Sequence, residues 1–367
     1  MGKMRYGALE GDRSELVRLS QASLLIQASL SEILSAKLQL NADAEPDQFD
    51  YHNSVDLIEG YISYRPVLSS FVRLRMRAGV FFPPVSMENT GPAWTSPYTI
   101  TTSAINSWIG EEVRPTGGEF SVVLSPESQE IAFTAAAFGN NDPAGTLLAW
   151  RGWALHDRQS GYSDRLPLAP IPAIQPDGLF ARQAPWVRPF REIDGRLGYY
   201  AGADWSHRLF ELRALRYDNR GIPTAFDGTQ YAWYTEFTNI GLSLHLPAGF
   251  EAIGQWMDGD SEMGPPGALN IAFDSAYVLV TAAFGSHRIS LRYDSFRVQD
   301  HDRWRMLDNN NEDGSAWTAA YLIQTGDHVR LGFELLRVES DRPARVSLGL
   351  PVRQEELEFQ AGARIQF

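Results

Sequence analysis

Three arginines alternate with apolar residues over a short stretch of the chain. Arg73, Arg75 and Arg77 are spaced by two, so on a β-strand they point to one face while Leu74 and Met76 point to the other. Three fixed positive charges on one face could sort ions and orient dipolar solutes in a confined, wet space. The same arginines could instead form an ion-paired wall without a selective role.

The segment that follows this ladder contains acids that could oppose it. Glu88, Glu111 and Glu112 are the candidate partners, and together with the arginines they predict the constriction of a pore. Trp94, Tyr98 and Trp108 lie in the same segment. They are candidates for stacking on a sugar or an aromatic solute, although they could equally attach the segment to a wall.

Other kinds of chemistry have little support in the sequence. The chain has no cysteine and seven histidines, and it contains no HExxH, GxSxG or P-loop motif, so we predict neither an enzyme nor a cofactor. The stretch Asp308–Gly314 is rich in oxygen ligands but lacks the EF-hand spacing, which leaves a cation site there open. A formal net charge of −13 argues against a nucleic-acid partner.

The C-terminal stretch shows which elements must position these residues. Leu357, Phe359, Ala361, Ile365 and Phe367 alternate with polar residues such as Gln360 and Arg364, the period of a strand with one apolar and one polar face. We expect the apolar set to face lipid or a subunit interface, and Arg364 and Gln360 to face the interior. Similar segments recur, and we expect strands at 3–8, 16–29, 33–43, 55–65, 70–82, 113–124, 129–139, 196–205, 208–218, 231–245, 249–257, 270–284, 287–297, 315–325, 328–339 and 355–367.

Tight turns and long polar loops alternate between these segments. This pattern predicts an all-β fold: a 16-stranded antiparallel transmembrane β-barrel with short periplasmic turns and long extracellular loops, built as a single domain over residues 1–367. A soluble all-β protein is the alternative. Five further arginines fall on predicted inward faces, interleaved with acids, and are expected to line the lumen wall: Arg213, Arg288, Arg292, Arg330 and Arg364.

Two connections are much longer than the others. Residues 83–112 are expected to fold inward as a constriction loop, and residues 140–193 to form a long extracellular loop. Asp142 before Pro143 suggests a helix over 143–155, and whether this loop caps the pore stays open. Four aromatic residues near strand ends are expected in interfacial girdles: Tyr199, Trp205, Trp233 and Trp317.

The stretch RLRMRAGVFFPPVSMEN, the following NSWIGEE and the terminal Phe367 resemble bacterial outer-membrane porins, most closely the phosphate-selective porin O/P family. The resemblance implies a homotrimer in the bacterial outer membrane, in contact with lipid and lipopolysaccharide, with its third loop folded into the lumen. Because Met1–Gly7 lack the apolar core of a secretory signal, we expect the mature form of an exported protein with an added Met1.

The function expected on these grounds is a porin, a water-filled channel for passive diffusion of small polar or charged solutes. One alternative is a substrate-specific channel, for an anion or a sugar, with a binding site at the constriction loop. A barrel-based outer-membrane enzyme or adhesin is a further alternative. The sequence leaves the solute, the ion selectivity and the oligomeric state beyond the resemblance open.

Overall fold

The computed structural model describes residues 22–42, 55–303 and 309–367. Its strands are β1 (Ala22–Ser29), β2 (Leu34–Ala42), β3 (Val55–Tyr64), β4 (Val72–Val80), β5 (Thr116–Leu124), β6 (Gln129–Gly139), β7 (Leu166–Pro167), β8 (Trp186–Val187), β9 (Gly198–His207), β10 (Phe210–Asp218), β11 (Tyr234–His245), β12 (Phe250–Met263), β13 (Leu269–Phe284), β14 (His287–Asp300), β15 (Glu312–Thr325), β16 (Val329–Asp341) and β17 (Arg353–Ile365). The α-helices are α1 (Ala104–Glu112) and α2 (Thr146–Trp150), and short 3-10 turns are η1 (Pro92–Trp94), η2 (Pro172–Ile174), η3 (Pro247–Gly249) and η4 (Pro343–Leu348). No helix of the described residues is long and apolar enough to cross a membrane.

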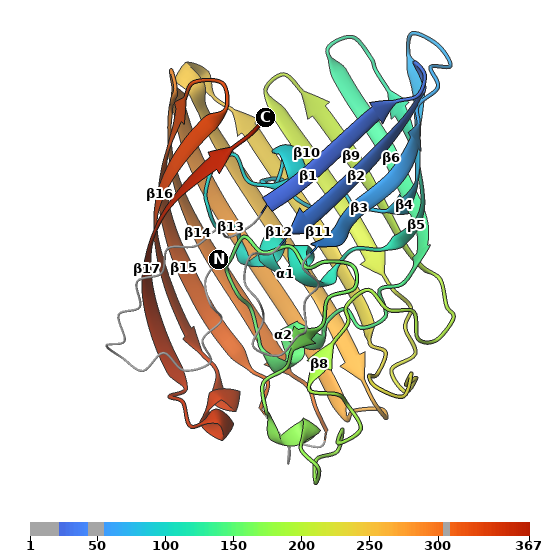
Figure 1. Cartoon of the computed structure of the whole chain (residues 1–367), viewed down its shortest axis with the longest axis vertical. Coiled ribbons are helices and arrows are strands. Elements are labelled where there is room, and N and C mark those ends of the chain that lie inside the picture. The colour runs from blue at the N-terminus through green and yellow to red at the C-terminus, as the bar shows by residue number, and fades with distance from the viewer. Residues whose placement is uncertain (1–21, 43–54, 304–308) are drawn as a thin grey trace.

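A single 15-stranded sheet contains every strand except the short β7–β8 pair. Each strand pairs antiparallel with its neighbour along the chain, and β6 pairs with β9 across the long 140–193 segment. Figure 1 shows the sheet curling round on itself, with α1 and α2 in its interior. The prediction of an all-β, antiparallel fold is confirmed.

Barrel closure and the count of sixteen strands stay predictions. The predicted first strand, 3–8, and the first part of the second, 16–21, lie outside the described residues. Within the described residues, β1 and β17 are the two edges of the sheet. The other fifteen predicted strands each correspond to one strand of the sheet.

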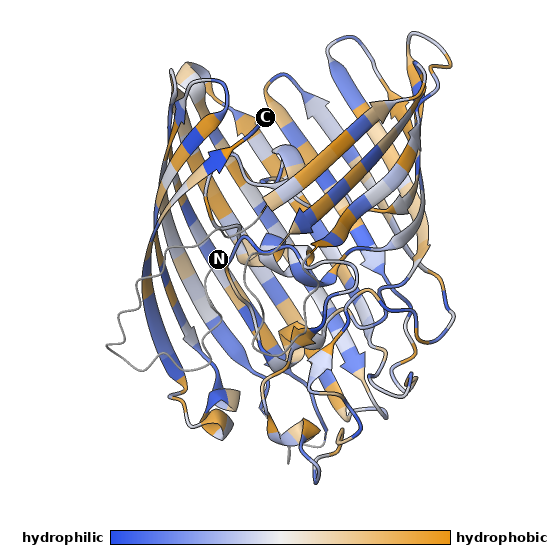
Figure 2. Ribbon diagram, viewed as in Figure 1, coloured by the Kyte–Doolittle hydropathy of each residue, from blue (hydrophilic) through white to orange (hydrophobic). Residues whose placement is uncertain are grey.

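The alternation of side chains explains how the sheet faces its two environments. On β17, Leu357, Phe359 and Ile365 are exposed on the outer face, at 67%, 69% and 57%. Arg364 points the other way and donates a 2.7 Å hydrogen bond to Thr95 Oγ1 in the interior. The predicted register of the last strand is therefore correct, and Figure 2 shows the same alternation of hydrophobic and hydrophilic residues along other strands.

Short connections gather at one end of the sheet, the turn end, and long ones at the other, the loop end (Figure 1). At the turn end, β13 passes to β14 through Gly285 and β15 to β16 through Gly326, with φ of 61° and 78°. Glycine takes this left-handed conformation without the steric cost of a Cβ. The chain can therefore reverse within a few residues.

Exposed apolar side chains form an outward band nearer the turn end. Its members on β11, β13, β14, β16 and β17 include Leu242, Val280, Leu291, Leu335 and Phe359. A cross-strand aromatic pair, Tyr293 and Trp317, borders this band, with ring centroids 4.8 Å apart. Further toward the loop end, the outward positions of β12 become acidic at Asp258, Asp260 and Glu262, which is why the alternation underestimated the length of this strand.

For three of the four residues the girdle assignment stays a prediction. Tyr199, Trp205 and Trp317 are exposed on the outer face. Trp233 is only 1% exposed, so its assignment to a girdle was wrong. It packs edge-to-face on Trp150, with centroids 5.3 Å apart, because the residue lies just before β11 where the chain turns into the interior.

The predicted helix over 143–155 is reduced to the five residues of α2. Gly145 and Gly152 adopt φ of 101° and 89°, outside the helical range, and limit the helix on both sides. Asp142 does not cap it, since its carboxylate accepts hydrogen bonds from the backbone N–H groups of Ile193 and Asp194. This part of the 140–193 segment lies inside the sheet (Figure 1).

Candidate functional site

The segment 83–112 lies against the inner face of the sheet. Ser103 caps α1 by accepting a 3.3 Å hydrogen bond from Asn106 N, and every residue of α1 is buried. The wall supplies partners for the backbone of the segment: Glu334 accepts from Thr101 N and Asp294 accepts from Ala104 N. These wall contacts satisfy backbone groups that would otherwise be buried without partners.

Arg292 on β14 is the centre of this attachment. Its side chain is fully buried and lies 2.8 Å from Asp294 and 3.2 Å from Glu88 of the segment. It also donates to the backbone oxygens of Thr101 and Thr102. A buried guanidinium with two carboxylates and several carbonyl acceptors has its charge and its donors satisfied, which fixes the segment on the wall.

All five predicted wall arginines contact the segment 83–112. Besides Arg292, these are Arg213 to Ser86 O at 2.7 Å, Arg330 to Ser96 O at 3.3 Å, Arg364 to Thr95 Oγ1 at 2.7 Å, and Arg288, whose guanidinium lies 5.0 Å from the centre of the Tyr98 ring. Each faces inward as the alternation predicted. The sequence did not reveal that they meet the same loop.

The arginine ladder on β4 faces inward but has other partners than predicted. Arg73 and Arg75 both pair with Glu130 of β6, and Arg77 pairs with Glu119 of β5 at 2.7 Å. The expected pairing with Glu88, Glu111 and Glu112 is not found in the described part of the chain. Strand register is the reason, since Arg77 lies directly opposite Glu119.

The three predicted loop acids are all buried and serve the interior packing. Glu88 pairs with Arg292, and Glu111 lies 2.6 Å from Arg151 and 3.1 Å from His156. Although burial opposes ionisation of Glu111, Arg151 and His156 hold its pKa well below the usual range. None of the three opposes the ladder.

No cation among the residues that the structure describes contacts Glu112. Its carboxylate accepts hydrogen bonds from Trp108 Nε1 at 2.7 Å and from the backbone N–H of Leu147 at 3.0 Å, which links α1 to the start of α2. Burial raises the pKa of Glu112 to about 7, against the lowering effect of these hydrogen bonds. The group therefore titrates near neutral pH.

The three aromatic candidates for solute stacking are covered by other groups. Trp108 and Tyr98 are 1% and 6% exposed, and Trp94 stacks on Phe82 with ring centroids 4.1 Å apart. Trp108 lies edge-to-face between Phe237 and Phe273, at 5.5 and 5.2 Å. The alternative role, attaching the segment to the wall, fits their surroundings.

The loop end of the interior is filled by an apolar core. Trp108 of α1, Trp150 of α2 and Trp153 belong to one buried cluster with inward-facing residues of the wall such as Phe237 and Phe273. Toward the turn end the inner face is more polar: Arg73 and Arg75 are 42% and 46% exposed. The interior therefore divides into a packed loop end and a solvated, charged turn end.

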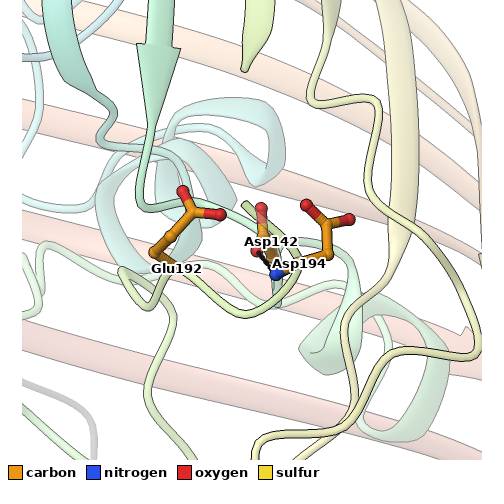
Figure 3. Close-up of side chains that lie close together, drawn as sticks. All are labelled: Asp142, Glu192 and Asp194. Carbon is orange, nitrogen blue, oxygen red and sulfur yellow. Dashed lines mark hydrogen bonds between the residues drawn. The ribbon is translucent and has the colours of Figure 1, made fainter. Parts of the chain in front are cut away.

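One group of carboxylates could offer ligands to a cation. Asp142, Glu192 and Asp194 have oxygens within 4.8 Å of one another, as Figure 3 shows. Each carboxylate also accepts backbone N–H groups, so the cluster is already explained as loop structure. Burial and the two neighbouring acids raise the pKa of Asp142 to about 7.

The two described acids of the stretch Asp308–Gly314 do not converge on one point. Asp308 lies outside the described residues. Glu312 points inward and accepts from Trp153 N, whereas Asp313 points outward to Arg297 at 3.2 Å. Adjacent strand residues face opposite sides of the sheet, so these two acids cannot share a ligand.

Sequence reasoning missed Glu119 and Glu130 as partners of the arginine ladder. Both lie on inward positions of predicted strands, so the alternation already predicts that their side chains face inward. The sequence could not show which arginines they pair with. The long segment 83–112 joins β4 to β5, so no short turn fixes which residues of these two strands lie opposite each other.

No protein-family model matches the chain. A comparison with curated proteins likewise finds no similar sequence. Among solved structures, the outer membrane channel DcaP of Acinetobacter baumannii has a similar fold, with a TM-score of 0.57, 9% identity, and coverage of 95% of this chain and 84% of DcaP. The class defined by the sheet is therefore an all-β, antiparallel fold similar to that of this channel.

Two other structures are more distant. In-vitro folded OmpT, an outer membrane protein of Vibrio cholerae, gives a TM-score of 0.49 at 10% identity, covering 94% of this chain and 88% of OmpT. The anion-selective porin from Comamonas acidovorans gives 0.45 at 12% identity, covering 94% of this chain and 87% of the porin. At such identities only the fold can be compared, and of the three structures named here DcaP has a TM-score above 0.5.

Proposed function

We propose that this protein is a porin of the bacterial outer membrane, a channel for passive diffusion of small polar or charged solutes. One observation carries the proposal: a single curled antiparallel sheet has an apolar outer face and a charged inner face. Val278 and Leu357, exposed at 58% and 67%, would face water in a soluble protein at a large hydrophobic cost. In a bilayer, the apolar lipid chains would cover these side chains, and a closed sheet would give every backbone N–H and C=O group a hydrogen-bond partner.

The turn end of the interior supports an aqueous entrance. Arg73, Arg75 and Glu130 form partly exposed ion pairs there, on an inner face that would be desolvated if the barrel were packed throughout. In the proposed orientation this end faces the periplasm, since short turns do so in outer-membrane barrels. The segment 83–112 then forms the constriction, fixed by Arg292, and the packed 140–193 segment covers the extracellular half.

The packed loop end supports a narrow channel, which keeps a substrate-specific channel as the second candidate. Trp108, Trp150 and Trp153 occupy space that a wide general pore would leave to water. A homotrimer and contact with lipopolysaccharide belong to the same proposal, by the resemblance to porins. An enzyme or adhesin on a barrel scaffold would require no solute flux at all.

Liposome swelling tests this function. Purified protein is reconstituted into liposomes, and the swelling rate is measured in isotonic solutions of sugars of increasing size. For a porin, the swelling rate falls as the size of the sugar increases. The largest sugar that still enters is smaller for a narrow, substrate-specific channel than for a general porin. Liposomes that contain folded protein but swell no faster than protein-free liposomes would refute the channel.

A further inference from the structure

Both ends of the described sheet contact one short turn in the interior, residues 91–95. On one side, Gln39 of β2 donates a 3.4 Å hydrogen bond to Ala93 O, and η1 lies next to β1. On the other side, Arg364 of β17 donates to Thr95 Oγ1 at 2.7 Å. Within the described residues, β1 and β17 are the two edges of the sheet, so the turn connects its two ends.

The length of the turn limits how far apart these contacts can be. Ala93 and Thr95 are two residues apart, so their Cα atoms are separated by at most about 7 Å. Gln39 and Arg364, in contrast, lie near opposite ends of the chain. Bringing together strands that are distant in sequence costs conformational entropy. A turn that binds both strands restricts the separations they can adopt.

Side-chain amides hold the turn in an unusual backbone conformation. Ala93 and Trp94 are both left-handed, with φ of 54° and 55°. Residues with a Cβ keep this conformation only where their surroundings fix it. Gln159 of the 140–193 segment donates to Ala93 O at 2.8 Å and to Trp94 O at 3.2 Å, and Asn89 donates to Trp94 O at 3.2 Å. The carbonyl groups of the left-handed residues are therefore fixed from two sides.

The indole of Trp94 fixes the turn against the rest of the interior. It stacks on Phe82, with ring centroids 4.1 Å apart and planes at 8°. It also lies against Gly110 of α1, where an added Cβ would come within 3.2 Å of the indole. A turn that is fixed in this way can oppose movement of the strands that it contacts.

We propose that residues 91–95 form an internal clasp, which fixes the separation between β1–β2 and β17. The position between β1 and β17, here called the seam, is where the proposed barrel closes. The inference rests on the closed sheet of the proposed function but not on the passage of solutes. Gln39, Thr95 and Arg364 are positioning residues of the clasp. Without them the seam should widen, while β11–β14 stay in place because continuous backbone ladders join them.

Distances between pairs of spin labels test the clasp in the folded protein. The chain has no cysteine, so labels attach only to cysteines that are introduced. The seam pair is Ile26→Cys on β1 with Phe359→Cys on β17, at outward positions that are 46% and 69% exposed. The reference pair is Leu242→Cys on β11 with Leu291→Cys on β14, which are also exposed. Pulsed electron paramagnetic resonance in detergent micelles gives the distribution of each distance.

The clasp variant and its control remove the same types of side chain. Gln39→Leu with Thr95→Val removes the hydrogen bonds at both ends of the clasp and nearly preserves side-chain size. Gln129→Leu with Thr134→Val, the control, removes hydrogen bonds of similar length on β6. We expect a narrow seam distribution in the wild type and the control, and one at least about twofold wider in the clasp variant, because the edges open locally. The reference distance should not change in any variant.

An unchanged seam distribution in the clasp variant, or a broad one in the wild type, would overturn the clasp. Equal widening of the seam and reference distributions would overturn it as well, because it would show a general loss of structure. If the wild type conducts no ions but the seam alone widens in the clasp variant, the channel fails and the clasp stands. Conduction with an unchanged seam refutes the clasp alone. Thr95→Val by itself replaces the double variant if the latter does not fold.

Discussion

Arg292 is the residue on which the attachment of the segment 83–112 to the inner face of the sheet depends most. Replacing it with Met should leave Glu88 and Asp294 as buried carboxylates without a cation, at a cost of about 3–5 kcal/mol in the free energy of unfolding. Urea unfolding in detergent micelles measures this loss. We expect earlier proteolysis within 83–112 in the same variant.

The control for this experiment is Arg75→Met. Arg75 is 46% exposed and shares Glu130 with Arg73, so its removal should cost only about 0–1 kcal/mol. Equal losses of stability in the two variants would contradict the role of Arg292 as an anchor.

Glu112 predicts a pH dependence of the interior packing. Its pKa is raised by burial to about 7, so the stability associated with the neutral form is present at low pH and is lost as the pH rises toward 7. The free energy of unfolding should fall between about pH 4.5 and 7, by at most about 1.4 kcal/mol per pH unit from this group. Glu112→Gln should have a smaller slope than the wild type in this window, whatever its absolute stability. Identical slopes in urea titrations at several pH values would contradict the assignment.

At this scale the sequence predicted orientation better than contact. Alternation placed Arg213, Arg292 and Arg364 on the inner face correctly, because a strand has a fixed period of two. It could not reveal that Arg77 meets Glu119 or that Glu88 meets Arg292, since both pairs depend on segments far apart in the sequence.

At the scale of elements, α1 is held in place by apolar packing as well as by its cap. Trp108 lies between Phe237 of β11, Phe273 of β13 and Trp153. Trp108→Ala should leave a cavity and cost about 3–5 kcal/mol in the free energy of unfolding. We also expect larger current fluctuations in single channels, because the loop end would be less tightly packed.

Trp317→Ala provides the matched control for that prediction. Trp317 is 50% exposed on the outer face, so its removal creates no interior cavity and should leave the current noise unchanged. If both substitutions changed the noise equally, the packed loop end would not govern the pore.

The elements differed in how far the sequence specified them. Strands with an apolar outer face were predicted to within a few residues, whereas β12 was predicted too short because Asp258 and Asp260 replace apolar residues on that face. The 140–193 segment has no period, and its packing inside the sheet follows from tertiary contacts such as Trp150 with Trp233. The sequence alone did not show where its short helix begins and ends, because the left-handed conformations of Gly145 and Gly152 set these limits.

At the scale of the whole molecule, the division of the sheet into an apolar outside and a charged inside is the central feature. The interior is divided as well, by the segments 83–112 and 140–193. It has an apolar core toward the loop end and partly exposed charges toward the turn end. The proposed membrane channel would account for both divisions, because lipid would cover the outer band while solutes would enter at the charged end.

Single-channel recording in planar lipid bilayers tests this account most directly. The purified full-length protein, with its folded state verified by β-sheet circular dichroism, is added to one side of a bilayer in potassium chloride. The account predicts stepwise, reproducible increases of ionic conductance as single molecules insert, without any added ligand. Folded protein that associates with the bilayer but never raises its conductance above that of the lipid would contradict it.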